Sequence, residues 1–143
     1  MTKIIYYDVT ELAQHDKGTG IQRVTRAILN VLRKSPPLSW KVIPVFGNKD
    51  DGKFYRVLPG SDSFLDKYSI PDEIAPNQGD IFLSIDLTYN ITEDLRKTLA
   101  FYRLNGCGIF FIVYDLIPIE HPEWFDGTND WFEGNNYLEL FNY

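Results

Sequence analysis

A chain of 143 residues with 44% hydrophobic, 24% charged and 15% aromatic residues has the composition of one folded domain, which excludes fibrous and disordered proteins. Its 14 basic and 20 acidic side chains give a net charge of −6, so the overall positive charge of a nucleic-acid-binding domain is lacking. Cys107 is the single cysteine, which excludes an internal disulfide and fits a reducing compartment. We recognise no leader peptide and no apolar run of the roughly 18 residues that a membrane span needs, so we expect a cytoplasmic protein without a transmembrane segment.

The chain begins with a predicted strand and a predicted helix. Lys3–Val9 is a run of β-branched and aromatic residues, which is typical of a buried strand. A polar stretch follows it. Apolar residues then recur at helical spacing over Ile21–Leu32, with Thr19 or Gly20 as the N-cap and two prolines beyond the end of the helix.

The next segment predicts a hairpin. Trp40–Phe46 and Phe54–Leu58 have strand-like composition, and the residues between them are rich in Gly, Asn and Asp, as in a turn. Residues 59–77 contain three prolines and alternate poorly, so we expect irregular structure there.

A strand and helix pattern then recurs. Ile81–Asp86 is predicted as a strand, and Thr88 or Asn90 is expected to cap a helix that ends at an Asn-Gly pair. Ile109–Tyr114, apolar except at its last position, is the final predicted strand. Near-continuous apolar strands alternating with helices indicate a parallel sheet that is covered on both faces. We therefore expect a single α/β domain over residues 1–143, with a Rossmann-like, doubly wound and mostly parallel sheet.

Acidic residues come at the ends of three predicted strands, at Asp8, Asp86 and Asp115. In an open parallel sheet, ligands bind beyond the carboxyl ends of the strands, where the strand order reverses. If the first strand and the strand ending at Asp86 are neighbours at that point, Asp8, Asp86 and the loop Gly18–Gly20 face one crevice. The alternative is that each acid only forms a turn or caps a helix.

The loop Gly18-Thr19-Gly20 predicts an anion site. Glycines let a ligand approach the backbone closely, and a helix start offers free amides and a favourable dipole. Arg23 in the first turn opposes that dipole unless a bound anion or a neighbouring carboxylate compensates its charge, although a solvated arginine is the alternative. Arg23 also stands where a dinucleotide-binding fingerprint has its third glycine, and the glycine loop is not followed by the Lys-Ser or Lys-Thr pair of a P-loop.

Metal-dependent and nucleophilic catalysis find little support in the sequence. The spacing of Asp115, Glu120 and His121 matches no metal-ligand pattern, so we expect no metal or other cofactor. No serine lies at a strand-to-helix elbow, and Cys107 precedes a strand.

Four motifs follow one another in a recognisable order. They are Ile5–Thr10, Gly18–Val24, Leu83–Leu87, and Tyr114–Pro118 with His121–Glu123. Together they resemble the N-terminal domain of family 4 glycosyltransferases, which are two-domain enzymes of the GT-B fold. The resemblance extends from Ile4 to about Phe125 and is closest to bacterial members that build surface polysaccharides.

The resemblance implies that a hexosyl unit passes from a nucleotide-sugar to a glycan or lipid-linked acceptor, usually with retention and without a metal. It implies that the donor phosphates lie against Gly18, Thr19 and Gly20, with Arg23 beside them. Tyr114-Asp115 stands where relatives often have a His-Asp pair, and we assign these two residues to catalysis. A tyrosine can donate a hydrogen bond to a sugar but titrates near pH 10.

The donor-binding half of such enzymes, with its paired glutamates, is not recognisable in this sequence. We therefore expect the chain to be the N-terminal, acceptor-side domain of a longer enzyme, inactive alone, in the cytoplasm or peripheral at the inner membrane. The missing C-terminal donor domain is then its main partner. The alternative is a non-catalytic module whose crevice binds a sugar or nucleotide.

Overall fold

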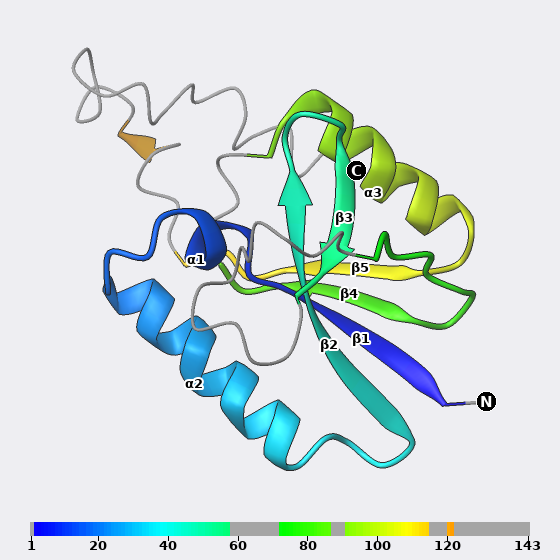
Figure 1. Cartoon of the computed structure of the whole chain (residues 1–143), viewed down its shortest axis with the longest axis horizontal. Coiled ribbons are helices and arrows are strands. Elements are labelled where there is room, and N and C mark those ends of the chain that lie inside the picture. The colour runs from blue at the N-terminus through cyan, green and yellow to red at the C-terminus, as the bar shows by residue number, and fades with distance from the viewer. Residues whose placement is uncertain (1, 58–71, 87–90, 115–119, 122–143) are drawn as a thin grey trace.

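The computed structural model of the chain describes residues 2–57, 72–86, 91–114 and 120–121 (Figure 1). A five-stranded sheet lies at its centre, made of β1 (Lys3–Asp8), β2 (Trp40–Asn48), β3 (Lys53–Arg56), β4 (Ile81–Ser84) and β5 (Gly108–Phe111). The strands lie in the order β3-β2-β1-β4-β5, and all neighbours are parallel except the antiparallel pair β2 and β3.

Helices pack on both faces of this sheet. They are α1 (Thr10–Gln14), α2 (Gly20–Lys34) and α3 (Glu93–Leu104). Figure 1 shows α1 and α2 on one side of the strands and α3 on the other. The predicted α/β architecture, a mostly parallel Rossmann-like sheet with helices, is confirmed.

Adjacent tyrosines of β1 divide the core between the two faces, because successive side chains of a strand point in opposite directions. Tyr6 is 1% exposed and belongs to a cluster with Leu95 of α3. Tyr7 is fully buried and belongs to a second cluster with Leu12 of α1 and Leu29 of α2. β1 is therefore the central strand on which both halves of the core are built.

The strand order reverses beside β1. The chain passes from β1 through α2 to β2 on one side, and β4 pairs with β1 on the other. Asp8, the last residue of β1, is in register with Val45 of β2 and Ser84 of β4. The first strand and the strand near Asp86 are therefore neighbours at the reversal, which is the condition for the predicted crevice.

The predicted hairpin is also confirmed, with Asn48 of β2 in register with Lys53 of β3. β2 runs two residues further than expected and β3 ends at Arg56. Most of the segment expected to be irregular, residues 59–71, lies outside the described residues, as does Leu58 at the end of the predicted strand. Within 72–77, Glu73 makes an isolated bridge to Tyr55.

One helix prediction was wrong, and one short helix was missed. The N-cap of α3 is Thr92, not Thr88 or Asn90, because the Thr92 hydroxyl accepts a hydrogen bond from the Leu95 amide at 3.4 Å. Helix α1 was not predicted at all. It has only five residues, and its N-cap Val9 makes no side-chain bond to it.

The last two strands are shorter than predicted. β4 ends at Ser84, so Asp86 lies just beyond the strand. β5 ends at Phe111, the residue in register with Ser84, instead of continuing to Tyr114. Phe110 is 54% exposed, so the apolar run that predicted a fully buried strand forms an edge of the described sheet.

Candidate functional site

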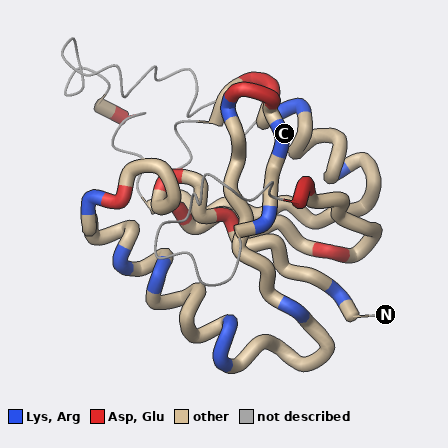
Figure 2. Tube along the Cα trace, in the orientation of Figure 1, with Lys and Arg blue, Asp and Glu red and all other residues tan. Residues whose placement is uncertain are grey.

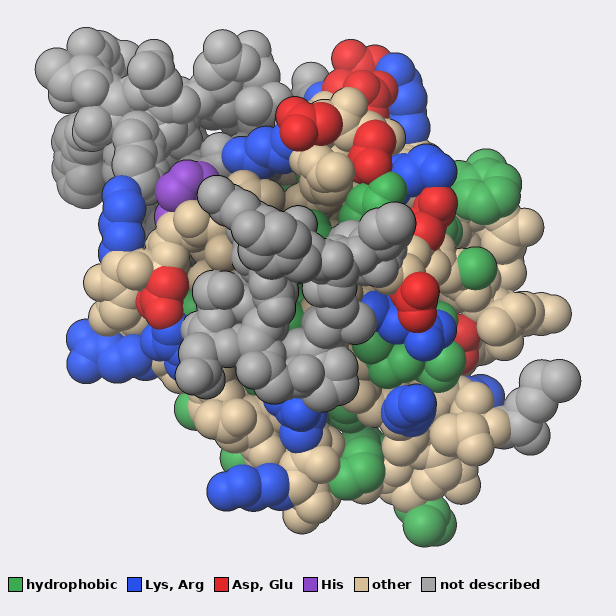
Figure 3. Space-filling view, viewed as in Figure 1, with side chains coloured by type: hydrophobic (Ala, Val, Ile, Leu, Met, Phe, Trp, Pro, Cys, Tyr) green, Lys and Arg blue, Asp and Glu red, His purple; other side chains and the backbone are tan. Residues whose placement is uncertain are grey.

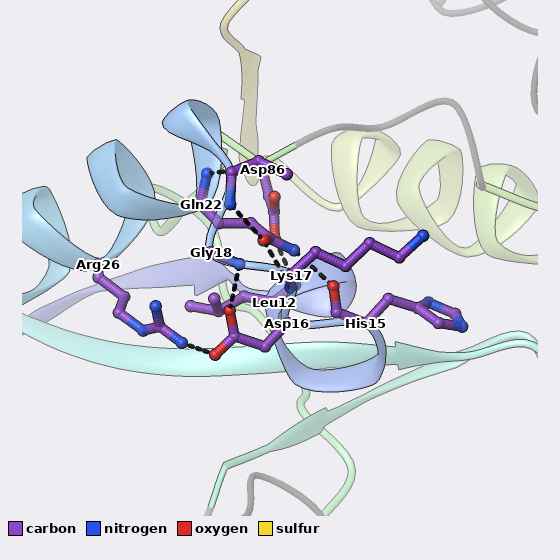
Figure 4. Close-up of polar contacts among 9 residues, drawn as sticks. Leu12, His15, Asp16, Lys17, Gly18, Gln22, Arg26 and Asp86 are labelled. Carbon is purple, nitrogen blue, oxygen red and sulfur yellow. Dashed lines mark hydrogen bonds and ion pairs between the residues drawn. The ribbon is translucent and has the colours of Figure 1, made fainter.

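The connection that carries the predicted glycine loop starts at the carboxyl end of β1, beside the end of β4. Asp8 ends β1, Asp86 follows β4, and α1 leads from β1 into residues 15–19, which precede the start of α2. Figure 4 shows Asp86 and the residues of this connection in one close-up. The edge is therefore the one that the sequence predicted.

Asp8 is 2% exposed, and its carboxylate is occupied within the protein. The amide and hydroxyl of Thr10 and the hydroxyl of Ser84 all donate hydrogen bonds to it, the last at 2.8 Å. The Thr10 hydroxyl in turn accepts a bond from the Gly47 amide of β2 at 2.8 Å. Burial raises the pKa of Asp8 in spite of these donors. Asp8 thus ties β1 to both neighbouring strands.

Asp86 is 1% exposed and contacts the other side of the reversal. Its Oδ2 accepts a hydrogen bond of 2.8 Å from the amide of Leu12 in α1. Asp86 therefore holds α1 against the end of β4. Asp8 and Asp86 lie at the same edge, as predicted. Their hydrogen bonds are those of the alternative interpretation, in which such acids form turns and hold helices.

Tyr114 lies close to Asp86 and is 38% exposed. Its hydroxyl donates a hydrogen bond of 2.8 Å to the carbonyl of Ile85. Burial, and after it the charge of Asp86, raise the pKa of Tyr114 above its ordinary value of 10.0. The phenol is therefore protonated at neutral pH and can donate a hydrogen bond. Asp115, its predicted partner, lies outside the described residues.

The start of α2 is closed by a capping box. The Thr19 hydroxyl accepts a hydrogen bond from the Gln22 amide at 3.3 Å, and the Gln22 side chain accepts one from the Thr19 amide at 3.1 Å. The Arg23 amide donates to the Thr19 carbonyl. Within the described chain, the amides of Gly20 and Ile21 have no such partner, so two donors remain at this helix start.

The two glycines of the loop meet different requirements. Gly18 has φ +65°, a conformation that glycine adopts without a Cβ penalty. Gly20 lies in open space, since a Cβ built on it meets no atom within 4 Å. The packing of the described chain therefore does not explain the missing side chain at Gly20.

The charges of the two long helices differ at their starts. The first turn of α2 contains no acid and carries Arg23, an exposed residue without an ion pair to another described residue. The first turn of α3 contains Glu93 and Asp94, which satisfy the helix dipole. Figure 2 shows this contrast, with positive but no negative residues along α2 and negative residues at the start of α3. The predicted conflict between Arg23 and the dipole is thus uncompensated in the described chain.

The first two arginines of α2 differ in whether they form an ion pair with another described residue. Arg26 forms an ion pair with Asp16, whose other oxygen accepts a hydrogen bond from the Gly18 amide at 3.1 Å. Arg23 remains available. Figure 3 shows Lys and Arg side chains exposed along this side of the molecule.

Sequence reasoning missed Gln22, which is 4% exposed and contacts three backbone groups of the preceding loop. The signal was present, because a threonine followed three residues later by glutamine is a capping-box spacing.

Among the parts of the chain that the structure describes, no three His, Cys, Asp or Glu side chains are grouped as a metal site requires. In the same parts, no helix is long and apolar enough to cross a membrane.

Comparison with known proteins gives three similar sequences, each the serotype-specific mannosyltransferase WbdA of Escherichia coli. Two of them are 31% identical to this chain over 123 residues, and the third is 29% identical over the same length. The curated relatives of this chain are thus bacterial glycosyltransferases. The aligned stretch is 86% of this chain but 15% of each relative, so the chain spans a small part of their length. No family model and no solved structure matches the chain.

Proposed function

We propose that this chain is the N-terminal, acceptor-side domain of a longer glycosyltransferase of the family 4, GT-B type. That enzyme transfers a hexosyl unit, mannose by analogy with WbdA, from a nucleotide-sugar to a glycan or lipid-linked acceptor of a bacterial surface polysaccharide. Support comes from the similarity to WbdA, the Rossmann-like sheet and the four motifs of the sequence.

The observation that carries the proposal is the helix start at Gly20, where two backbone amides have no hydrogen-bond partner within the described residues. Among the described residues, nothing accepts from the amides of Gly20 and Ile21, and Arg23 adds a positive charge that the first turn does not compensate. Backbone amides at a helix start bind phosphate, and Gly20 leaves room for a close approach. In our account Gly18 and Thr19 set the turn, and the donor diphosphate lies against this start.

Transfer breaks the bond between the anomeric carbon and a donor phosphate oxygen and forms a bond to an acceptor hydroxyl oxygen, whose proton passes to the departing diphosphate or to water. The departing nucleoside diphosphate gains negative charge, which fixed amide donors and Arg23 stabilise more in the transition state than in the ground state. In our account Tyr114 and Asp115 contact the acceptor side of the reaction. Asp8 and Asp86 are buried beneath this edge and hold β1, β4 and α1 in place under the proposed site.

The proposed location of the complete enzyme is the cytoplasmic side of the inner membrane, with which it associates peripherally. This location follows from the proposed acceptor, since lipid-linked glycans are held at a membrane.

The test uses the complete enzyme that contains this chain, with radiolabelled GDP-mannose as donor and a bacterial polysaccharide extract as acceptor. We expect transfer by the complete enzyme, a higher donor KM or lower kcat for Gly20→Val, and no transfer by the 143-residue chain alone. Unchanged kinetics for Gly20→Val would contradict the assignment of the loop. Donor binding without transfer would favour the non-catalytic binding module instead.

A further inference from the structure

The side chain of Gln22 makes more contacts than a capping box needs. In a capping box, the side chain at the third helical position needs to accept only one hydrogen bond, which the N-cap amide donates. The Oε1 of Gln22 accepts that bond from Thr19 and a second from the amide of Lys17 at 2.9 Å. Its Nε2 donates to the carbonyl of His15 at 2.6 Å. Figure 4 shows this side chain reaching across the loop.

These bonds fix the backbone that leads into the helix. Gln22 contacts residues 15, 17 and 19, so it holds every second residue of the loop. One turn later on the same helix, Arg26 pairs with Asp16, which accepts a bond from Gly18. The loop is thus held to α2 along its whole length, and the direction of the Gly20 and Ile21 amides follows from that.

Glutamine is the side chain that fits all of these partners. Glutamate, which also serves in capping boxes, would accept from Thr19 and Lys17 but has no N–H to donate to the His15 carbonyl. It would also place a negative charge in the first turn, where α2 has none. Both differences disfavour an anion at the helix start.

We propose that Gln22 is a positioning residue, which holds the loop of residues 15–19 so that the amides of Gly20 and Ile21 are oriented toward the donor diphosphate before it binds. This inference rests on the proposed function. Donors that are fixed in advance lose less entropy on binding and need no reorganisation during the reaction.

The first experiment measures the loop itself by amide hydrogen exchange in the 143-residue chain. In the wild type, the Lys17 and Thr19 amides should exchange slowly and the Gly20 amide fast. Gln22→Met, which keeps the buried volume, should raise the exchange rates of Lys17 and Thr19 by about tenfold or more while those of β1 stay unchanged. Unchanged rates at Lys17 and Thr19 would overturn the proposal, and they do so independently of enzyme activity.

The second experiment measures kinetics in the complete enzyme with GDP-mannose as donor. Gln22→Glu retains the capping bond, so the helix start still forms. We expect the donor KM to rise by about tenfold, with the acceptor KM unchanged. Thr92→Ala removes the cap of α3 and serves as the matched control, with the donor KM of the wild type.

The outcomes separate the two proposals. If the wild-type enzyme transfers sugar and Gln22→Glu has the wild-type donor KM, the role of Gln22 is refuted and the proposed function stands. If the wild type transfers no sugar, the proposed function fails, and the exchange rates of Lys17 and Thr19 still decide whether Gln22 holds the loop.

Discussion

The amide of Leu12 donates a hydrogen bond of 2.8 Å to the carboxylate of Asp86, and the two residues are 74 positions apart in the chain. The bond fastens α1 to the end of β4, and α1 leads directly into the loop before α2. The position of the glycine loop therefore depends on a carboxylate from the other side of the strand reversal. The same hydrogen bond therefore stabilises the fold and positions the loop of the proposed donor site.

Removing that hydrogen bond should lower stability. In Asp86→Ala, the buried Leu12 amide loses its acceptor, which costs about 1–3 kcal/mol. Asp86→Asn retains an oxygen acceptor and should cost less. Urea denaturation followed by tryptophan fluorescence measures both, and an alanine variant as stable as the wild type would show that this bond contributes nothing.

Asp8 should make stability depend on pH in an unusual direction. Its pKa in the folded protein is raised above the ordinary value of 3.8, chiefly by burial, so the folded state holds the proton to higher pH than the unfolded state. The free energy of unfolding therefore decreases as pH rises from 3.8 through the folded pKa.

Asp8→Asn removes this titration and isolates its effect. The difference in unfolding free energy between wild type and variant should move in favour of the variant as pH rises from about 4 to about 7. Urea denaturation at several pH values gives this difference. A difference that does not vary with pH, or that moves toward the wild type, is incompatible with a raised pKa.

Two glycines should respond in opposite ways to alanine. A Cβ at Gly20 meets no atom, so Gly20→Ala should leave the free energy of unfolding within about 0.5 kcal/mol of the wild type or raise it. A Cβ at Gly47 would lie 3.0 Å from the Leu95 side chain and 3.1 Å from that of Phe54, so Gly47→Ala should destabilise by about 1–3 kcal/mol. Thermal denaturation of both variants checks this, and a Gly20→Ala that is the less stable of the two would show that the space beside Gly20 is filled.

Tyr114→Phe should have a small effect that is independent of pH. The variant loses the hydrogen bond to the Ile85 carbonyl, which is worth about 1 kcal/mol. Because the pKa of Tyr114 is raised from 10.0, the phenol of the folded protein stays protonated at about pH 6 and at about pH 9. The loss of stability should therefore be the same at both pH values. Denaturation curves at the two pH values measure it, and a loss that shrinks at pH 9 would indicate an ionised phenol.

Local patterns predicted the features that depend on nearby residues. The helical spacing after Gly20 and the hairpin at β2 and β3 both follow from short-range preferences, and both were found. The strand and helix rhythm predicted a parallel sheet. The neighbouring positions of β1 and β4 were a condition of the predicted site, and the structure meets it.

The features that were missed depend on distant contacts or on a weak local signal. Ser84 reaches Asp8 from 76 residues away, and no pattern within either segment indicates that pairing. The apolar run after Gly108 has the composition of a central strand. In the described sheet, however, β5 pairs with β4 alone and ends where β4 ends. Helix α1 is too short to show periodicity.

The most direct test of the donor site compares two arginines of α2 in the complete enzyme. Arg23 lies in the first turn and Arg33 in the last, about 15 Å apart along the helix, and both are exposed. If the first turn holds the donor diphosphate, Arg23→Ala raises the donor KM by about fivefold or more, while Arg33→Ala leaves it unchanged. Equal donor KM values for wild type, Arg23→Ala and Arg33→Ala would contradict the account.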